Sequence, residues 1–256
     1  MTMQADDAAP LPPTEAAESS RVQLRSDMDV DLIRSAARDA DVVFAARVST
    51  QGEASLSTVE ADASGSTGLI SYLMRSRHGT PFEHNSMTFH VRAPLFVFRE
   101  FQRHRIASYN EESGRYRELE AVFYTPAPDR KLVQVGKAGH YTFIEGETAQ
   151  YELVTGLVRR QSESAYGAYR EMLDAGIARE VARIVLPLNL YSSMYVTLNA
   201  RSLMNFLSLR TTAPDSAYPS YPQREIEMVA EAMEQQWTEL MPLTHAAFVK
   251  HGRVAP

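Results

Sequence analysis

The chain of 256 residues contains no cysteine. Disulfides, thiolate metal ligands and cysteine nucleophiles are therefore excluded as sources of stability or chemistry. Lysine is almost as scarce, because 23 of the 26 cationic side chains are arginines. A GC-rich coding sequence accounts for this bias along the chain as a whole, but it does not explain why four arginines fall within residues 103–117.

Long apolar runs and the common phosphate-binding loops are also missing. No apolar run reaches the roughly 18 residues that a membrane-spanning helix needs, and neither a Walker loop nor a G-x-G-x-x-G motif occurs. The net charge of −6 disfavours a general attraction to nucleic acids or acidic membranes. We therefore expect no nucleic-acid or membrane partner, and any anion site must be local.

The first 20 residues carry acidic side chains, prolines and many small residues, without a basic start or an apolar core. This composition is typical of a disordered tail and not of a secretion signal. We expect a folded domain over residues 21–256 and, because nothing requires an oxidising compartment, a cytoplasmic location.

Hydrophobic periodicity predicts an α+β fold. Helical spacing and capping residues predict helices over 31–46, 66–77, 94–105, 151–176, 178–186, 200–210 and 226–240. Strands are expected at 21–25, 86–92, 119–124 and 192–197, and loops or irregular segments at 51–68, 110–114, 129–146 and 211–222. Because the strands do not alternate regularly with helices, we expect a mixed or antiparallel sheet packed with long helices in a single compact domain.

Chemistry-bearing side chains concentrate at Arg103-His104-Arg105 and in the following ten residues. Guanidinium groups bind phosphate or carbonyl oxygens, and His104 can stack or hydrogen-bond on an aromatic ligand. The alternative is a solvated helix face, on which Glu100 would pair with Arg103 and His104. The pattern thus favours an anion site but leaves a structural role open.

The segment Ser113-Gly114-Arg115 closes this cluster. Gly114 removes the side chain that would keep a ligand from the backbone, and Ser113 and Arg115 offer donors on both sides. A nucleophilic serine needs a positioned base, and the neighbouring residues supply none. We therefore expect Ser113 to donate a hydrogen bond; an ordinary polar turn is the alternative.

Further polar residues interrupt apolar segments. Arg201 and Asn205 lie on one face of the helix expected at 200–210, and Arg183 and Arg210 raise the same question of what they bind. Either a ligand or the acidic residues of another helix would satisfy them. Histidines also recur at positions 78, 84 and 90, but a spacing of six matches no metal motif, so no metal site is expected.

These residues together resemble the flavin-dependent thymidylate synthases. Arg103-His104-Arg105 with Ser108 matches the R-H-R-x-x-S signature of that family. Four more blocks look like family blocks in the expected order, and together they cover most of residues 40–245: Ala45–Ser49, His78–His84, Arg179–Arg183 and Asn199–Leu207.

The resemblance implies reductive methylation of dUMP to dTMP, with methylenetetrahydrofolate as one-carbon donor, bound FAD as hydride carrier and NADPH as reductant. It also implies a homotetramer with active sites at subunit interfaces. The absence of cysteine agrees, because the cysteine-dependent thymidylate synthases attack carbon 6 of uracil with a thiolate. Arg210 is expected to activate the uracil, and Ser113 is expected to assist as a donor.

The family likeness also assigns residues to two ligands. The FAD ligands would be His78, Thr80, Arg103, His104, Arg105, Glu111, Asn199, Arg201 and Asn205, with Ser49, Glu83 and Asn110 in the same site. The dUMP site would comprise Glu100, Arg103, Glu111, Ser113, Gly114, Arg115, Arg183 and Arg210.

One segment departs from the family pattern. Where many relatives have a short turn containing a histidine after the last arginine, this chain has Thr211–Pro222, in which Tyr218 or Tyr221 takes the place of that histidine. Two alternatives to catalysis are a nucleotide- or RNA-binding module that uses Arg105, Arg115 and nearby tyrosines, and a scaffold whose arginines pair across an oligomer interface. The acidic pI near 5.7 argues against the RNA module.

Overall fold

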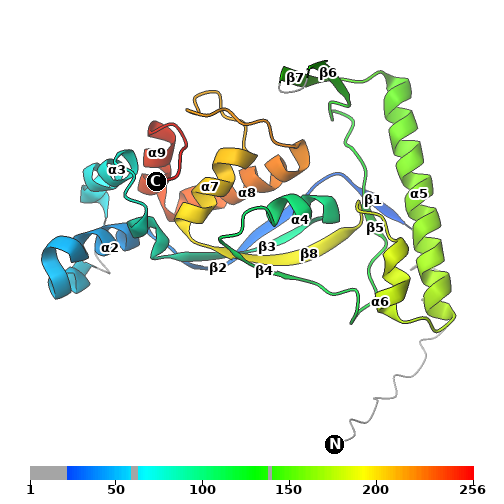
Figure 1. The fold of residues 1–256 in the computed structure, drawn as a ribbon, viewed down its shortest axis with the longest axis horizontal. Helices are drawn as coiled ribbons and strands as arrows, with labels where there is room; N and C mark the ends of the chain where they lie inside the picture. The colour runs from blue at the N-terminus through cyan, green and yellow to red at the C-terminus, as the bar shows by residue number, and fades with distance from the viewer. Residues whose placement is uncertain (1–21, 59–62, 138–139) are drawn as a thin grey trace, which may run out of the picture. The chain divides into compact units, whose positions relative to one another are not determined.

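The computed structural model describes residues 22–58, 63–137 and 140–256 (Figure 1). The chain divides into two compact units: the first holds residues up to Ser26 with Ser113–Tyr191, and the second holds Asp27–Glu112 with Ser192–Pro256. The tail expected at residues 1–20 lies outside the described residues. Among the residues described, no helix is both long and apolar enough to cross a membrane.

The second unit is built on a four-stranded sheet with the order β2-β3-β8-β4. Its strands are β2 (Asp29–Ala36), β3 (Ser86–Pro94), β8 (Tyr191–Leu198) and β4 (Ser108–Glu111). β2 runs antiparallel to β3, and β4 runs antiparallel to β8. In β3 the side chains of Met87, Phe89 and Val91 alternate into the core and are fully buried, which is the pattern that predicted this strand.

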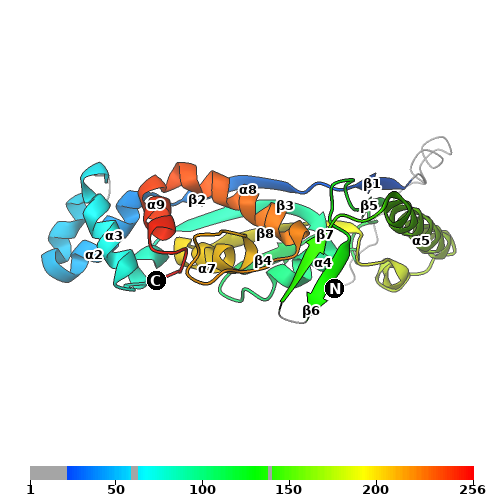
Figure 2. The ribbon, with the colours of Figure 1, turned by 90° about the horizontal axis from the view of Figure 1, so that it is seen from above.

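Helices α4 (Leu95–Phe101), α7 (Ala200–Arg210) and α8 (Arg224–Leu240) lie on one face of this sheet (Figures 1 and 2). Helices α2 (Asp39–Gln51), α3 (Thr67–Arg75) and α9 (Pro242–Lys250) pack on one another at one end of it. The 3-10 helices η1 (Gly52–Thr58) and η2 (Ser64–Ser66) lie between α2 and α3, and η3 (Thr80–Glu83) lies between α3 and β3. Fully buried aromatic side chains fill the core between the layers: Phe82, Phe89, Phe98, Phe206, Trp237 and Phe248.

The first unit contains the long helix α5 (Thr148–Asp174) and a parallel pair of short strands, β1 (Gln23–Arg25) and β5 (Val122–Tyr124). It also contains α6 (Arg179–Ala182), the 3-10 helix η4 (Arg183–Val185) and an antiparallel hairpin of β6 (Val133–Lys137) and β7 (His140–Ile144). Two buried tyrosines of α5 hold the backbone of Leu119: Tyr169 accepts its N–H at 3.1 Å, and Tyr166 donates to its carbonyl at 3.2 Å. The expected α+β class with a mixed or antiparallel sheet arrangement is confirmed; the single domain boundary at 21–256 stays a prediction.

The helix predicted over 31–46 is wrong in its first half, because Asp29–Ala36 forms β2 and α2 begins only at Asp39. Two long-range contacts explain the difference. β2 pairs with β3, and the side-chain amide of Gln236 on α8 accepts the N–H of Leu32 and donates to the carbonyl of Val30. Neither partner is visible in the local spacing of apolar residues.

The helix predicted over 94–105 is also too long, since α4 ends at Phe101. The hydroxyl of Tyr109 hydrogen-bonds to the carbonyl oxygens of Phe101 and His104, and so competes for the acceptors that a longer helix would use. His104 N–H instead bonds back only three residues, to Phe101. Arg103, His104 and Arg105 therefore lie in a turn, not on a helix face.

Three other segments are more regular than expected. Part of 110–114 belongs to β4, the segment 129–146 contains the β6–β7 hairpin, and the described residues of 51–68 form helical turns. Helix α9 was not expected at all. The loop predicted at 211–222 is confirmed.

Asp39 joins two helices of the second unit and yields the first prediction. Its buried carboxylate accepts the N–H groups of Leu243 and Thr244 at 2.9 Å, and the Thr244 hydroxyl at 2.6 Å. It therefore caps the first turn of α9 from the start of α2.

The variant Asp39→Ala should lower the free energy of unfolding by about 2 kcal/mol, because it leaves buried donors unpaired. Denaturant titration followed by circular dichroism measures this loss. The control Thr50→Ala removes an exposed hydroxyl at the other end of α2 and should change the value by less than about 0.5 kcal/mol. Equal effects of the two variants would contradict the capping role.

Candidate active site

The residues predicted for the site are divided between the two units. Ser113, Gly114, Arg115 and Arg183 belong to the first unit, and the remaining predicted residues belong to the second. The second unit holds His78, Thr80, Glu100, Arg103, His104, Arg105, Glu111, Asn199, Arg201, Asn205 and Arg210, together with Ser49, Glu83 and Asn110.

Arg210 is the last residue of α7, and its side chain joins two groups from the end of α4. Its Nε donates to Nε2 of His104 at 3.1 Å, and Nη1 donates to Oε2 of Glu100 at 3.0 Å. The apolar face of α7 is buried, and Phe206 stacks on Phe101 with ring centroids 4.4 Å apart. This packing brings Arg210 to two polar residues, Glu100 and His104, that precede it by 110 and 106 positions in the sequence.

The environment fixes the charge states in this cluster. Burial, with help from the positive charge of Arg210, lowers the pKa of His104 to about 4. Because Nε2 accepts a hydrogen bond from Arg210, the neutral ring carries its proton on Nδ1. Burial raises the pKa of Glu100, a shift that Arg210 opposes and the buried carboxylate of Glu225 reinforces.

A second cluster lies around the start of α7. The side chain of Asn199 caps this helix by accepting the N–H of Ser202 at 2.9 Å. Arg201 forms an ion pair with Glu83 and donates from Nε to the carbonyl oxygen of Pro256 at 2.6 Å. A Cβ atom on Gly79 would lie 2.7 Å from the guanidinium carbon of Arg201, so this glycine is required for the close approach.

Other predicted residues of the second unit have accessible side chains. Arg103 and Arg105 are exposed in the turn after α4, and Thr80 and His78 are exposed near the start of η3. Asn205 is exposed on α7, where its amide donates to the carbonyl of Arg201 at 3.2 Å. Ser49 and Asn110 are also exposed, and Glu111 accepts the Ser192 hydroxyl at 2.8 Å.

In the first unit, the residues from Ser113 to Arg115 form a turn. The Ser113 hydroxyl accepts the N–H of Arg115 at 3.3 Å, and Nε of Arg115 donates to Glu180 at 3.0 Å. A Cβ atom on Gly114 would lie 2.8 Å from the side chain of Leu119 and 3.2 Å from that of Arg183. Gly114 therefore lets Arg183 lie against the turn, a packing role that adds to the expected access for a ligand.

Sequence reasoning missed several residues that shape the site. Tyr109 sets the end of α4, and burial raises the pKa of its hydroxyl to about 12. Phe206 lies edge-on to the ring of His104 at 4.9 Å, and Glu225 acts on Glu100 from α8. Phe206 and Glu225 act across more than 100 positions, and Tyr109 bonds back to carbonyl groups eight and five residues earlier, so no hydrophobic periodicity indicates these partners. Among the described residues, no group of three or more acidic, histidine or cysteine side chains could hold a metal ion.

Comparisons with known proteins identify the family of the chain. The family model described as thymidylate synthase complementing protein matches residues 31–243, a range that includes the predicted residues of both units. The chain is 62% identical over 241 residues to the flavin-dependent thymidylate synthase of Streptomyces coelicolor, covering 94% of this chain and 98% of the relative. It is 58% identical over 231 residues to the enzyme of the same name from Tropheryma whipplei, covering 90% and 96%.

Solved structures show the same likeness. A UMP/dUMP methylase, PolB from Streptomyces cacaoi, bound with 5-Br UMP, superposes with a TM-score of 0.85 at 56% identity over 92% of this chain and all of that chain. The same protein bound with 5-Br dUMP gives a TM-score of 0.86 at 57% identity. Fold and sequence thus define the class, a cysteine-free α+β enzyme of the thymidylate synthase complementing type. The chain belongs to the flavin-dependent thymidylate synthase family, as the resemblance indicated.

The electrostatics of the cluster yield the second prediction. Replacing Arg210 by glutamine removes a nearby positive charge, so the pKa of His104 should rise above about 4 while staying below 6.5, because burial persists. Histidine NMR titration measures the shift, and Arg99→Gln, at an exposed position of α4, is the control. In the wild type, the unfolded chain binds a proton at His104 more readily between pH 6.5 and 4, so this group lowers stability as pH falls through that window. Equal pKa values in both variants would refute the coupling.

Proposed function

We propose that this enzyme methylates dUMP reductively to dTMP, with methylenetetrahydrofolate as one-carbon donor, FAD as hydride carrier and NADPH as reductant. One observation carries the proposal: Arg210 is held by both Glu100 and a neutral His104 in a chain without cysteine. Because the chain offers no thiolate to add to the uracil, we infer that a nearby positive charge makes carbon 5 electron-rich. A guanidinium group beside the ring stabilises negative charge developing at nitrogen 3 and so raises the electron density at carbon 5.

The cluster suits Arg210 for this task. A guanidinium group has more N–H donors than the two bonds to Glu100 and His104 use, so donors remain for a uracil ring. Glu100 fixes the orientation of the group, and His104 accepts a hydrogen bond without adding a competing positive charge. The group is therefore oriented before substrate arrives, as electrostatic catalysis requires.

The second unit also offers groups that fit FAD. Exposed guanidinium groups at Arg103 and Arg105 suit the diphosphate of this cofactor, and Gly79 lets Arg201 approach the backbone closely. We assign His78, Thr80, His104, Glu111, Asn199 and Asn205 to the same ligand. When bound, FAD supplies hydride-transfer chemistry that no amino-acid side chain can provide.

The first unit offers groups that fit the nucleotide phosphate. Arg115 and Arg183 can bind a dianionic phosphate, with Ser113 as a hydroxyl donor at the turn. Arg115 forms an exposed ion pair with Glu180. Such a pair contributes little to stability, so a phosphate can replace Glu180 as the partner of Arg115. Gly114 keeps Arg183 against this turn.

We also propose a homotetramer with active sites at subunit interfaces, which would exclude water during hydride transfer. Large apolar side chains exposed on this chain support the proposal: Ile106 and Ile184 are 76% and 74% exposed, and Leu153 and Leu157 lie one helical turn apart on α5. The cytoplasmic location stays a prediction.

The proposal predicts a yellow protein. Purified enzyme should show a flavin absorption spectrum, and it should release tritium from dUMP labelled at carbon 5 only when NADPH and methylenetetrahydrofolate are both present. Omission of each compound in turn is the control. A preparation that cannot take up FAD, even with dUMP added, would overturn the assignment.

Two variants separate the roles of Arg210 and Ser113. Arg210→Ala should lower kcat by at least about a hundredfold while FAD stays bound, because it removes a group that acts on the uracil alone.

Ser113→Ala should weaken dUMP binding by about tenfold, because it removes one hydrogen bond to the ligand. Steady-state kinetics with flavin absorbance on the same samples checks both. Loss of flavin from Arg210→Ala would contradict its role, and complete inactivity of Ser113→Ala with normal dUMP binding would make the serine a nucleophile.

A second candidate function is methylation of UMP. It is favoured by the similarity to a UMP/dUMP methylase whose structures hold 5-Br UMP and 5-Br dUMP. The ratio of kcat/KM for dUMP and UMP under identical conditions distinguishes the two. We expect dUMP to be preferred, and a ratio below one would make the ribonucleotide the substrate.

A further inference from the structure

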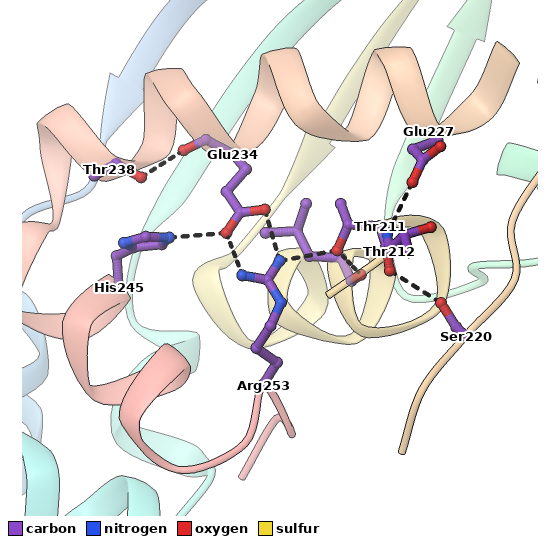
Figure 3. Close-up of polar contacts among 9 residues, drawn as sticks. Thr211, Thr212, Ser220, Glu227, Glu234, Thr238, His245 and Arg253 are labelled. Atoms are coloured by element: carbon purple, nitrogen blue, oxygen red, sulfur yellow. Dashed lines mark hydrogen bonds and ion pairs between the residues drawn. The ribbon is translucent and has the colours of Figure 1, made fainter. Parts of the chain in front are cut away.

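A largely buried ion-pair cluster of the second unit, outside the site described above, contacts Thr211, the residue that follows Arg210 (Figure 3). Both carboxylate oxygens of Glu234 on α8 accept hydrogen bonds from the guanidinium group of Arg253: Nη1 donates to Oε1 at 2.7 Å, and Nη2 donates to Oε2 at 2.6 Å. His245 on α9 contacts the same carboxylate at 2.8 Å. Nη2 of Arg253 also donates to the Thr211 hydroxyl at 2.8 Å.

The cluster holds Arg253 in one orientation. Its side chain is 11% exposed and that of Glu234 is 16% exposed. Burial opposes ionisation of Glu234, but hydrogen bonds from His245 and Arg253 overcome this effect and lower its pKa to about 2. The backbone of Arg253 also adopts a specific conformation: its φ of 55° is left-handed, which is uncommon for a residue with a side chain.

Thr211 links this cluster to Arg210. It follows Arg210 directly, it caps the end of α7, and it is buried. Its backbone N–H and its hydroxyl both donate to the carbonyl of Leu207, at 3.0 and 2.7 Å, while the hydroxyl accepts from Arg253. The last turn of a helix normally frays because its carbonyls lack partners. Here Thr211 bonds the turn that carries Arg210 through the carbonyl of Leu207, and Arg253 holds Thr211 in place.

We propose that Arg253 is a positioning residue for Arg210 and acts through Thr211, with Glu234 orienting Arg253. The proposal rests on the role of Arg210 given above. Loosening the last turn of α7 displaces the guanidinium group from Glu100 and His104, and a displacement of about 1 Å at a reacting group can cost up to about a hundredfold in rate.

The kinetic test uses the full-length enzyme with FAD. Thr211→Val and Arg253→Gln should each lower kcat by about tenfold with unchanged flavin content, and the double variant should lose no more than either single variant, because both break one connection. Thr211→Ser keeps the hydroxyl and should retain kcat within about twofold. Independent effects that multiply in the double variant, or a Thr211→Ser enzyme as slow as Thr211→Val, would overturn the proposal.

A matched control separates positioning from general destabilisation. Arg170 of α5 forms an ion pair with Glu118 in the first unit, and this pair is partly exposed, at 28% and 39%. Arg170→Gln and Arg253→Gln should both lower the melting temperature, but Arg170→Gln should leave kcat within about twofold of wild type. If Arg253→Gln fails to fold, Thr211→Val still tests the connection, because it leaves the Glu234–Arg253 pair intact.

A second readout does not depend on catalysis. If Arg210 moves away, the pKa of His104 should rise from about 4 in both Thr211→Val and Arg253→Gln, as in Arg210→Gln. Histidine NMR titration of the three variants decides this even if the enzyme proves inactive on dUMP, so failure of the proposed function and failure of this inference are distinguishable. If the pKa of His104 is the same in Thr211→Val as in the wild type, the inference is wrong.

Discussion

Pairing of the largely buried guanidinium group of Arg210, whose side chain is 19% exposed, is the constraint on which the rest of the structure depends. A cation removed from water must find acceptors, because an unpaired buried charge costs several kcal/mol. Glu100 and His104 supply them from the end of α4. They reach Arg210 because α4 stops at Phe101, whose ring stacks on Phe206 and so holds the end of α4 against α7. Tyr109 sets the end of α4, and the turn that follows places His104 within hydrogen-bond distance of Arg210.

Charge balance within the cluster follows from the same burial. A protonated His104 would place two cations in contact, and burial together with Arg210 prevents this by keeping the ring neutral near physiological pH. Burial raises the pKa of Glu100, Glu225 adds to this shift, and the positive charge of Arg210 opposes it. Arg210 thus carries the positive charge of this three-residue group, and its field can act on a bound ligand.

The sequence predicted those elements whose causes are local. The bounds of α7 were predicted correctly because Asn199 caps it and its apolar spacing is regular. The helix predicted over 31–46 is wrong at β2 because this strand pairs with β3 and is bonded by Gln236, 204 positions away, and the predicted end of α4 is wrong because it depends on Tyr109. For the site, the family resemblance named Glu100, His104 and Arg210, but only the fold shows that they meet.

The end of a helix is a physically suitable place for this arginine. The carbonyl groups at a helix C-terminus carry partial negative charge, which stabilises a cation there by about 0.3–1 kcal/mol and offsets part of its desolvation. The end of a helix is normally mobile. A cation there is held in a fixed position only if other groups stabilise the last turn. Thr211 closes it through the carbonyl of Leu207. A lysine would keep the charge but could not bind His104 and Glu100 through two separate nitrogens, which explains why an arginine suits this position.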